Sequence, residues 1–271
     1  MKNKDYDYKI YIPSGNPTAL VFGIENDPAR RKEINDEIMK EYDDFVEQVG
    51  FVNTDINKPE LMMAGGEFCG NATRSAVKYY LNDKKGDLQM KVSGVPELLN
   101  TGMDEDGNAW VDMPIIKGEY GKSIKKLTET SAIVKMYGIT HVVIESGDVN
   151  KEFSKEALKK YAFGILEKNN LLCEDAAGVM FVNRIDEENI EIAPVVYVRA
   201  INTLFYETAC GSGTTAVGVY ESFKRKSGID INILQPSGNT INVKTNVDDK
   251  NIYNVRISGK VMEYNRQLIK K

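Results

Sequence analysis

The sequence has little of several features that common protein classes require. It holds one histidine and three cysteines with no CxxC pair, which argues against a structural zinc site and against a disulfide scaffold. No apolar run approaches the roughly 20 residues that a membrane helix needs, and the polar segment 1–9 lacks the apolar core of a signal peptide. We therefore expect a cytoplasmic protein whose thiols are reduced.

A basic patch and a phosphate loop are also missing. Lysine and arginine total 35 against 40 acidic residues, a net charge of −5, which disfavours a nucleic-acid partner. No glycine-rich phosphate loop accompanies a lysine, so we expect neither a cofactor nor a metal. With 42% hydrophobic residues, the chain is long enough for one large core or two smaller ones.

Apolar periodicity predicts short strands that alternate with helices. The predicted helices are Pro28–Glu47, Gly70–Leu81, Ser154–Asn169 and Gly211–Arg225, with Ser154 as an N-cap. The predicted strands are Ala19–Gly23, Leu88–Ser93, Ala109–Met113, His141–Glu145, Gly178–Val182, Ile231–Leu234 and Tyr253–Ile257. This order is typical of a mixed α/β (α+β) protein.

The two halves of the chain resemble each other. A glycine-flanked cysteine opens a helix in each half, Cys69 before Gly70 and Cys210 before Gly211, and the two lie about half a chain apart. Pro13–Asn16 and Pro236–Asn239 both read Pro-Ser-Gly-Asn. Two sequence motifs that each occur twice indicate an internal duplication and predict two similar lobes that face each other.

A cluster of glycine and lysine at Lys117–Lys126 suggests where the lobes divide. We predict an N-terminal lobe at 1–119 that carries the Cys69 helix and a C-terminal lobe at 120–261 that carries the Cys210 helix. The tail, 262–271, is expected to return to the first lobe. The active site is expected in the cleft between the lobes.

Two cysteines at helix starts indicate proton chemistry. The first N–H groups of a helix lack intrahelical acceptors and its positive end favours anions, so the thiol pKa values of Cys69 and Cys210 are expected to fall. Two such ends can hold one carboxylate while the two sulfurs flank the adjacent carbon. One thiolate then removes the α-proton and the opposite thiol returns a proton to the other face.

Other interpretations of the cysteines remain. A free cysteine is commonly a small buried hydrophobic residue, and we assign Cys173 to that class. Cys69 and Cys210 could instead form a structural or regulatory disulfide between the lobes. Such a disulfide would also arise as an inactivating, reversible side effect when the site is empty.

The cysteine segments resemble the two motifs of the diaminopimelate epimerase family. Cys69–Arg74 is similar to the first motif and Ala209–Thr214 to the second, and the similarity extends over most of the chain. Asn16 falls where the family places an asparagine that contacts substrate. The resemblance implies two pseudo-symmetric lobes, each a mixed curled sheet around a central helix, with no cofactor and a two-thiol mechanism.

The departures from that family concern the distal end of the substrate. The epimerases carry an arginine shortly before the second cysteine, but 200–207 holds no basic residue and Arg199 lies out of register. An Asn-Pro before a histidine is replaced by Ile139-Thr140, and an asparagine between Leu61 and Cys69 is lost. Diaminopimelate would leave a carboxylate unpaired here, although lanthionine-like substrates stay open.

The chain is more similar to the histidine racemases of opine-type metallophore pathways. Segments 13–16, 47–51 and 66–73 carry the likeness, which 91–94 and 235–238 extend. Arg74 departs from the neutral residue expected in that subgroup. The best expectation is conversion of L-histidine to D-histidine by an isomerase that needs no pyridoxal phosphate.

We predict Cys69 and Cys210 as catalytic residues. The predicted substrate-binding residues are Asn16, Glu47, Gly70, Asn71, Glu207, Gly211 and Ser212. Glu47 is the candidate acceptor for a substrate imidazole, unless it is a surface residue at the end of its helix. Phe68, Phe205 and Tyr206 are candidates for an apolar wall, with core packing as the alternative, and His141 is interpreted as a packing residue.

Three other functions compete with this prediction. An epimerase of another amino acid, of the diaminopimelate or lanthionine type, would use the same chemistry. A dithiol redox switch would have no activity when reduced, whereas a racemase requires both thiols. A non-catalytic amino-acid-binding protein would have no use for a cysteine at both helix ends. We expect a small-molecule partner and no membrane, and the sequence leaves a homodimer open.

Overall fold

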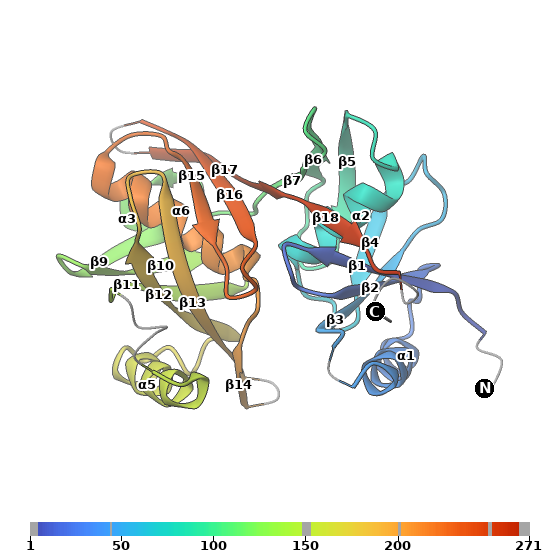
Figure 1. Cartoon of the computed structure of the whole chain (residues 1–271), viewed down its shortest axis with the longest axis horizontal. Coiled ribbons are helices and arrows are strands. Elements are labelled where there is room, and N and C mark those ends of the chain that lie inside the picture. The colour runs from blue at the N-terminus through green and yellow to red at the C-terminus, as the bar shows by residue number, and fades with distance from the viewer. Residues whose placement is uncertain (1–4, 44, 148–152, 200–201, 249–250, 266–271) are drawn as a thin grey trace. The chain divides into compact units, whose positions relative to one another are not determined.

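The computed structural model describes residues 5–43, 45–147, 153–199, 202–248 and 251–265. The chain forms two compact units, Met1–Val111 with Ser258–Lys271, and Asp112–Ile257 (Figure 1). The predicted lobes, 1–119 and 120–261, stay a prediction. In the predicted returning tail, Val261–Glu263 pairs with Tyr8–Pro13, whereas 266–271 lies outside the described residues.

The first unit alternates strand pairs with helices. Its elements are β1 (Tyr8–Pro13), β2 (Thr18–Phe22), α1 (Pro28–Glu41), β3 (Gln48–Val52), β4 (Glu60–Met63), α2 (Gly70–Leu81), β5 (Gly86–Val92), β6 (Leu99–Met103), β7 (Ala109–Asp112) at its boundary, and β18 (Val261–Glu263). Strands β1 and β2 are antiparallel, and β2 runs parallel to β3 across α1. Strands β3 and β4 are antiparallel, and β4 runs parallel to β5 across α2. Strand β18 pairs antiparallel with β1.

The second unit repeats this order of pairings. Its elements are β8 (Gly118–Glu119), α3 (Tyr120–Ser123), β9 (Ile124–Thr128), β10 (Ser131–Met136), β11 (Ile139–Glu145), α5 (Lys155–Lys168), β12 (Ala176–Arg184), β13 (Asn189–Val198), β14 (Thr203–Tyr206), α6 (Gly211–Arg225), β15 (Asp230–Leu234), β16 (Thr240–Val247) and β17 (Asn251–Gly259). Strands β10 and β11 are antiparallel, β11 runs parallel to β12 across α5, and β13 runs parallel to β15 across α6. The repeated topology supports the predicted duplication, in which α2 and α6 are equivalent.

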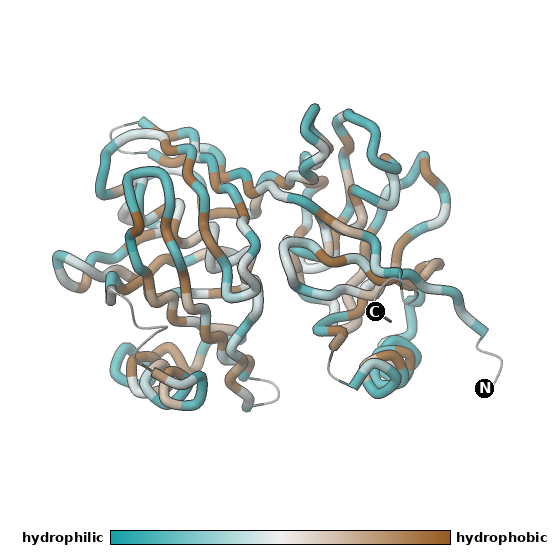
Figure 2. The backbone as a smooth tube through the Cα atoms, viewed as in Figure 1, coloured by the Kyte–Doolittle hydropathy of each residue, from teal (hydrophilic) through white to brown (hydrophobic). Residues whose placement is uncertain are grey.

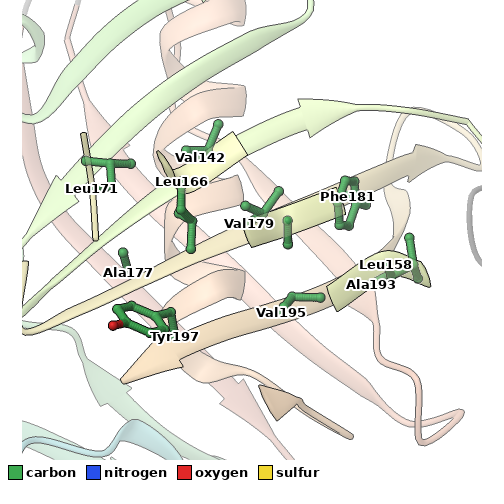
Figure 3. Close-up of a cluster of buried hydrophobic side chains, with 11 residues drawn as sticks. Val142, Leu158, Leu166, Leu171, Ala177, Val179, Phe181, Ala193, Val195 and Tyr197 are labelled. Atoms are coloured by element: carbon green, nitrogen blue, oxygen red, sulfur yellow. The ribbon is translucent and has the colours of Figure 1, made fainter. Parts of the chain in front are cut away.

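A helix covers each face of the sheet in the second unit. Helix α6 packs against β10, β11, β12 and β16, whereas α5 packs against β12, β13 and β14. Side chains alternate along a strand, so Val179 and Phe181 join the cluster under α5 while Met180 faces α6 (Figure 3). Burial on both faces explains why these strands are almost continuously hydrophobic, as the brown segments of Figure 2 show.

The first unit is built in the same way. Helix α2 packs against β1 to β6 and β18, and α1 packs against β3. Phe51 belongs to the cluster on the α1 side, whereas its neighbour Gly50 faces the other way. A Cβ on Gly50 would fall 2.8 Å from Leu61 Cδ1, so a larger residue here would have to displace the buried Leu61 side chain.

Three of the four predicted helices are confirmed. Helices α2 and α6 have the predicted bounds, and α5 begins after the Ser154 cap, whose Oγ accepts the Ala157 N–H at 3.2 Å. The predicted helix Pro28–Glu47 is too long, because α1 ends at Glu41 and Asp43 has a left-handed φ of 46°. Glu47 is therefore a half-buried loop residue directly before β3, not a surface residue at a helix end.

The two Pro-Ser-Gly-Asn segments are not equivalent positions of the duplication. Pro13–Asn16 joins β1 to β2, whereas Pro236–Asn239 joins β15 to β16, two strands that follow the central helix. Both are tight turns with left-handed glycines, Gly15 at φ 94° and Gly238 at φ 80°. The two turns also differ in geometry, because Ser14 has a left-handed φ of 53° whereas Ser237 is not left-handed. Only the two cysteine motifs therefore mark equivalent positions.

We predict that Leu166→Ala destabilises the protein by about 2–5 kcal/mol. Leu166 is fully buried between α5 and the sheet, and the substitution leaves a cavity in that cluster. Leu98→Ala, the same change at a position that is 57% exposed, should alter the unfolding free energy by less than about 0.5 kcal/mol. Urea unfolding of both variants measures the difference, and equal losses would contradict the packing described for α5.

Candidate active site

Cys69 is the N-cap of α2. Its backbone is extended, with φ −137° and ψ 115°, and its Sγ accepts the Ala72 N–H at 3.4 Å. The segment after β5 supports the preceding loop, because Ser93 Oγ donates to the Glu67 carbonyl at 2.6 Å. At Gly94 (φ 75°) a Cβ would lie 2.5 Å from the Phe68 nitrogen. The sulfur is therefore held by its own helix and by the loop that enters it.

A chain of hydrogen bonds joins Cys69 to Glu47. The Cys69 thiol donates to Gln48 Oε1 at 2.9 Å, and Gln48 Nε2 donates to Asn16 Oδ1 at 2.5 Å. Asn16 Nδ2 in turn donates to Glu47 Oε2 at 2.5 Å. Gln48 Nε2 also donates to Thr18 Oγ1 at 2.7 Å. The structure thus brings three of the predicted residues together in the first unit: Asn16, Glu47 and Cys69.

Arg74 lies in the interior beneath the first turn of α2. It is fully buried, and its guanidinium donates to Asn71 Oδ1 at 2.8 Å and to Ser14 Oγ at 3.3 Å. Burial lowers the pKa of Arg74 to about 10, an effect that the nearby Cys69 opposes. Since the group stays charged at neutral pH, it holds Asn71 and the β1–β2 turn together and places a cation near Cys69.

Cys210 has the equivalent position at the start of α6. Its backbone is extended, and its Sγ accepts the Gly213 N–H at 3.2 Å. Its own N–H donates to Gln235 Oε1 at 3.0 Å, so the turn after β15 fixes the entry to the helix. A Cβ on Gly213 would lie 2.2 Å from Met180 Sδ and 3.0 Å from Cys210 Sγ. Only glycine leaves room for the sulfur at that position.

The electrostatic setting of Cys210 corrects the prediction that both thiol pKa values fall. Burial raises the pKa of Cys210 well above its ordinary value, and the negative charge of Glu207 and its hydrogen bond add to the rise. Hydrogen bonds from Ser212 and from the Gly213 N–H oppose this effect without reversing it. Cys210 is 2% exposed, so desolvation outweighs the helix end and the resting group is a thiol.

His141 contributes to this site indirectly. It is fully buried, and its Nε2 lies 3.0 Å from Ser212 Oγ, which in turn lies 3.5 Å from Cys210 Sγ. Burial lowers the pKa of His141 to about 3, so the imidazole is neutral at physiological pH. The predicted packing role agrees with this burial, but the side chain also orients Ser212.

The remaining predicted residues divide into two groups. Gly70, Asn71, Gly211 and Ser212 form the first turns of α2 and α6, as expected. The predicted apolar wall is wrong for Tyr206, which packs against the α5 cluster and lies under Lys155 Nζ, 5.2 Å from the ring centroid. Its neighbour Phe205 points to the opposite face of β14 and is 41% exposed.

The third cysteine does not have the burial expected of it. Cys173 is exposed, so the prediction of a small buried hydrophobic residue is wrong. Its thiol donates to the Asn170 carbonyl at 3.1 Å, in the turn that follows α5. The apolar residues beside it misled the prediction, because Leu171 faces the α5 cluster while Cys173 lies outside it.

Sequence reasoning missed four residues that shape the two sites. Gln48 and Gln235 hold the cysteines directly, while Ser93 and Arg74 support the surrounding backbone. All four lie in segments that carry the family resemblance. For Gln48, Ser93 and Gln235 the available signal was a polar side chain at or next to the end of a strand, and for Arg74 it was a charged side chain among small residues of α2. A buried setting tolerates such side chains only with a partner.

The described part of the chain offers no group of three or more His, Cys, Asp and Glu side chains that could hold a metal ion. Among the same residues, no helix is long and apolar enough to cross a membrane.

Solved structures of low sequence identity share the fold. A phenazine biosynthesis protein of the PhzF family from Enterococcus faecalis superimposes with a TM-score of 0.64 at 15% identity, covering 96% of this chain and 97% of that one. A hydroxyproline epimerase from Agrobacterium vitis, with bound trans-4-hydroxy-L-proline, gives a TM-score of 0.62 at 12% identity, covering 98% and 92%. These likenesses confirm the predicted fold class.

Sequence relatives identify the family. A histidine racemase of Fusobacterium nucleatum is 33% identical over 243 residues, which cover 86% of this chain and 87% of the relative. A histidine racemase of Staphylococcus aureus is 26% identical over 258 residues, covering 89% of each chain. Residues 6–264 match the family described as the histidine racemase CntK N-terminal domain. The chain therefore belongs to the histidine racemase family and is an isomerase.

Proposed function

We propose that the protein interconverts L- and D-histidine with two thiols and no cofactor. One thiolate removes the α-proton, and the thiol of the other cysteine returns a proton to the opposite face. The observation that carries the proposal is that Cys69 and Cys210 cap equivalent central helices in two units of the same topology. The membership in the histidine racemase family supports histidine as the substrate.

The protonation of Cys210 suits it to the acid step. A proton donor must hold its proton at the working pH, and burial together with Glu207 keeps the Cys210 thiol protonated. After giving up the proton, its sulfur accepts the Gly213 N–H, with Ser212 Oγ beside it. The site therefore supplies hydrogen bonds to the thiolate that the reaction forms.

The helix ends contribute to the stability of the carbanion. Removing an α-proton sends negative charge into the substrate carboxylate, and the first-turn N–H groups of a helix with its positive dipole end favour such charge. We assign this role to Gly70 and Asn71 on α2 and to Gly211 and Ser212 on α6. The buried Arg74, bonded to Asn71 Oδ1, fixes the side chain of one member of that set.

We assign the substrate imidazole to Glu47. An ionised carboxylate accepts several hydrogen bonds, and the bond from Asn16 Nδ2 fixes the orientation of Glu47. A carboxylate that accepts an imidazole N–H discriminates histidine from aliphatic amino acids, because the latter leave it without that partner. The proposal includes a cytoplasmic location. It also includes a homodimer as the alternative to a monomer.

We predict that Cys69→Ala and Cys210→Ala each lower kcat/KM for histidine racemisation by about 10²- to 10⁴-fold or more, because each removes one of the two proton carriers. The measurement is α-proton exchange in D₂O by NMR, together with loss of optical activity, on the reduced enzyme with L-histidine. Near-normal turnover by either variant would show that the two-thiol mechanism is wrong.

A panel of substrates separates the mechanism from the substrate. Exchange with L-histidine but not with diaminopimelate or lanthionine supports the proposal as it stands. Exchange with only one of the other amino acids of the panel would support the two-thiol mechanism and would identify that amino acid, not histidine, as the substrate. If the reduced enzyme exchanges none of them, the dithiol switch becomes the better explanation of the cysteines.

We predict that alkylation of Cys210 begins at a higher pH than that of an ordinary thiol. Only the thiolate reacts, and with a raised pKa the thiolate forms only as the pH climbs through that higher value. Glu207→Gln removes a negative charge, so it lowers the pKa and moves the onset to lower pH, with a several-fold faster reaction at pH 7.5. Peptide mass spectrometry after iodoacetamide treatment measures both.

Cys173 provides the control within the same sample. It is an exposed thiol far along the chain from Glu207, so its alkylation rate should not change in the Glu207→Gln variant. An unchanged onset at Cys210 would mean that Glu207 has no part in holding its proton.

A further inference from the structure

We propose that Gln48 is a positioning residue that couples the protonation of Cys69 to the charge of Glu47 through Asn16. The two ends of this chain are the proposed proton carrier and the proposed acceptor of the substrate side chain. The inference rests on the proposed function for its catalytic consequence, whereas the coupling itself is a property of the enzyme without substrate.

The charge of Glu47 determines the direction of every hydrogen bond in the chain. An ionised carboxylate only accepts, so Asn16 must turn its NH₂ group to Glu47 and its carbonyl oxygen to Gln48. Gln48 must then direct its own NH₂ group to Asn16 Oδ1, with Thr18 Oγ1 as a second acceptor. The carbonyl oxygen of Gln48 is left facing Cys69 Sγ at 2.9 Å. A sulfur in that position has to donate, so an ionised Glu47 stabilises the Cys69 thiol.

Loss of the thiol proton reverses this preference. A thiolate 2.9 Å from a carbonyl oxygen is repelled, whereas a rotated Gln48 amide would donate to it. Rotation of Gln48 requires rotation of Asn16, and Asn16 can turn only when Glu47 carries a proton or is otherwise neutralised. The thiolate of Cys69 and the neutral form of Glu47 therefore favour each other.

Arg74 supplies the opposing charge. As a buried cation, it favours the Cys69 thiolate, and its Nε has no hydrogen-bond partner within the described residues. Cys69 is thus placed between a cation that favours ionisation and an oriented chain that resists it. Such a balance lets a change at Glu47 decide the protonation of the thiol.

The other charged groups on the elements packed around α2 are accounted for. Glu60 on β4 pairs with Lys91 on β5 at 2.7 Å, and Glu263 on β18 pairs with Lys9 on β1 at 2.9 Å. Lys78 on α2 pairs with Asp83, and Asp87 on β5 is exposed.

Burial keeps three tyrosines on these elements neutral. Tyr11 on β1 and Tyr80 on α2 stay neutral because burial raises the pKa of each. Tyr8 on β1 is neutral for the same reason, and Tyr79 on α2 stacks on Phe22. Glu47 and Arg74, together with the exposed Glu67 two residues before Cys69, are therefore the charges that the proposal has to weigh.

The second unit has a simpler version of the same device. There Glu207 acts on the Cys210 thiol directly and raises its pKa. In the first unit the carboxylate is two amides away, so its influence depends on Gln48 and Asn16 remaining in place. This difference lets one carboxylate act both as the proposed acceptor of the substrate imidazole and as the group that governs a thiol.

The test is a double-mutant cycle on the rate of Cys69 alkylation without substrate. Glu47→Gln removes the acceptor-only group, so the chain can reverse and the inflection of the pH profile should fall by about one pH unit. Because a less basic thiolate is also less nucleophilic, the rate at pH 7 should rise about threefold. In a Gln48→Met background the same Glu47→Gln change should have no effect.

Two controls keep the result interpretable. Glu67→Gln removes an exposed negative charge two residues before Cys69, and any effect it has should be the same in the Gln48→Met background as in the otherwise unchanged chain. Asn16→Ala breaks the chain at another link and should abolish the Glu47→Gln effect as Gln48→Met does, which provides a second variant if Gln48→Met does not fold.

If the full Glu47→Gln effect persisted in both the Gln48→Met and the Asn16→Ala variants, the proposal would be overturned, because the carboxylate would then act through space. The proposal would also be overturned if the Glu47→Gln substitution alone had no effect on the alkylation of Cys69. Neither outcome depends on which amino acid is racemised, because the readout is made without substrate. Failure of histidine exchange in D₂O would remove the proposed substrate and leave the coupling unaffected.

Discussion

Each unit depends on the same interaction, a cysteine sulfur that accepts the third backbone N–H of the helix it caps. Cys69 accepts the N–H of Ala72, and Cys210 accepts the N–H of Gly213. In each unit that helix is surrounded by the strands, so the sulfur is fixed by the most buried element available. A side chain held by backbone geometry keeps its position without many partners of its own, which leaves its protonation to be set by the neighbours.

Those neighbours make the two thiols electrostatically different despite their equivalent places in the fold. Cys210 is buried and lies beside Glu207, and both features raise its pKa and keep the proton on the sulfur. Cys69 is half-buried, with Arg74 in the interior and an amide chain that leads to Glu47. The duplication supplied two similar helix ends, and the surrounding side chains gave the two sulfurs different charged neighbours. In the proposed reaction one sulfur must be ionised while the other is protonated, and the two exchange these states in the reverse direction.

Much of the architecture was predictable because the cysteine-bearing helices have clear periodicity and caps. The bounds of α2 and α6 follow from apolar spacing after a glycine. The end of α1 could not be predicted in this way. The chain turns at the left-handed Asp43, and Val46 then packs in the core, a long-range contact that helical periodicity does not reveal. Gln48 was missed for a related reason: its role follows from partners at Asn16 and Cys69 that only the fold brings near. Tyr206 was misplaced because adjacent strand residues face opposite sides, a rule that applies once the strand is known.

The pairing of β18 with β1 has a consequence for biosynthesis. The turn that carries Asn16 is completed by a backbone bond from Ser14 to the carbonyl of Lys260, residues at opposite ends of the chain. During synthesis from the N-terminus, the first unit is made first but lacks this strand until nearly the whole chain has emerged. The second unit is continuous in sequence, but its own last strand, β17, ends only one residue before β18 begins. The last strands of the two units, β17 (Asn251–Gly259) and β18 (Val261–Glu263), are therefore made one directly after the other, and both units stay incomplete until then.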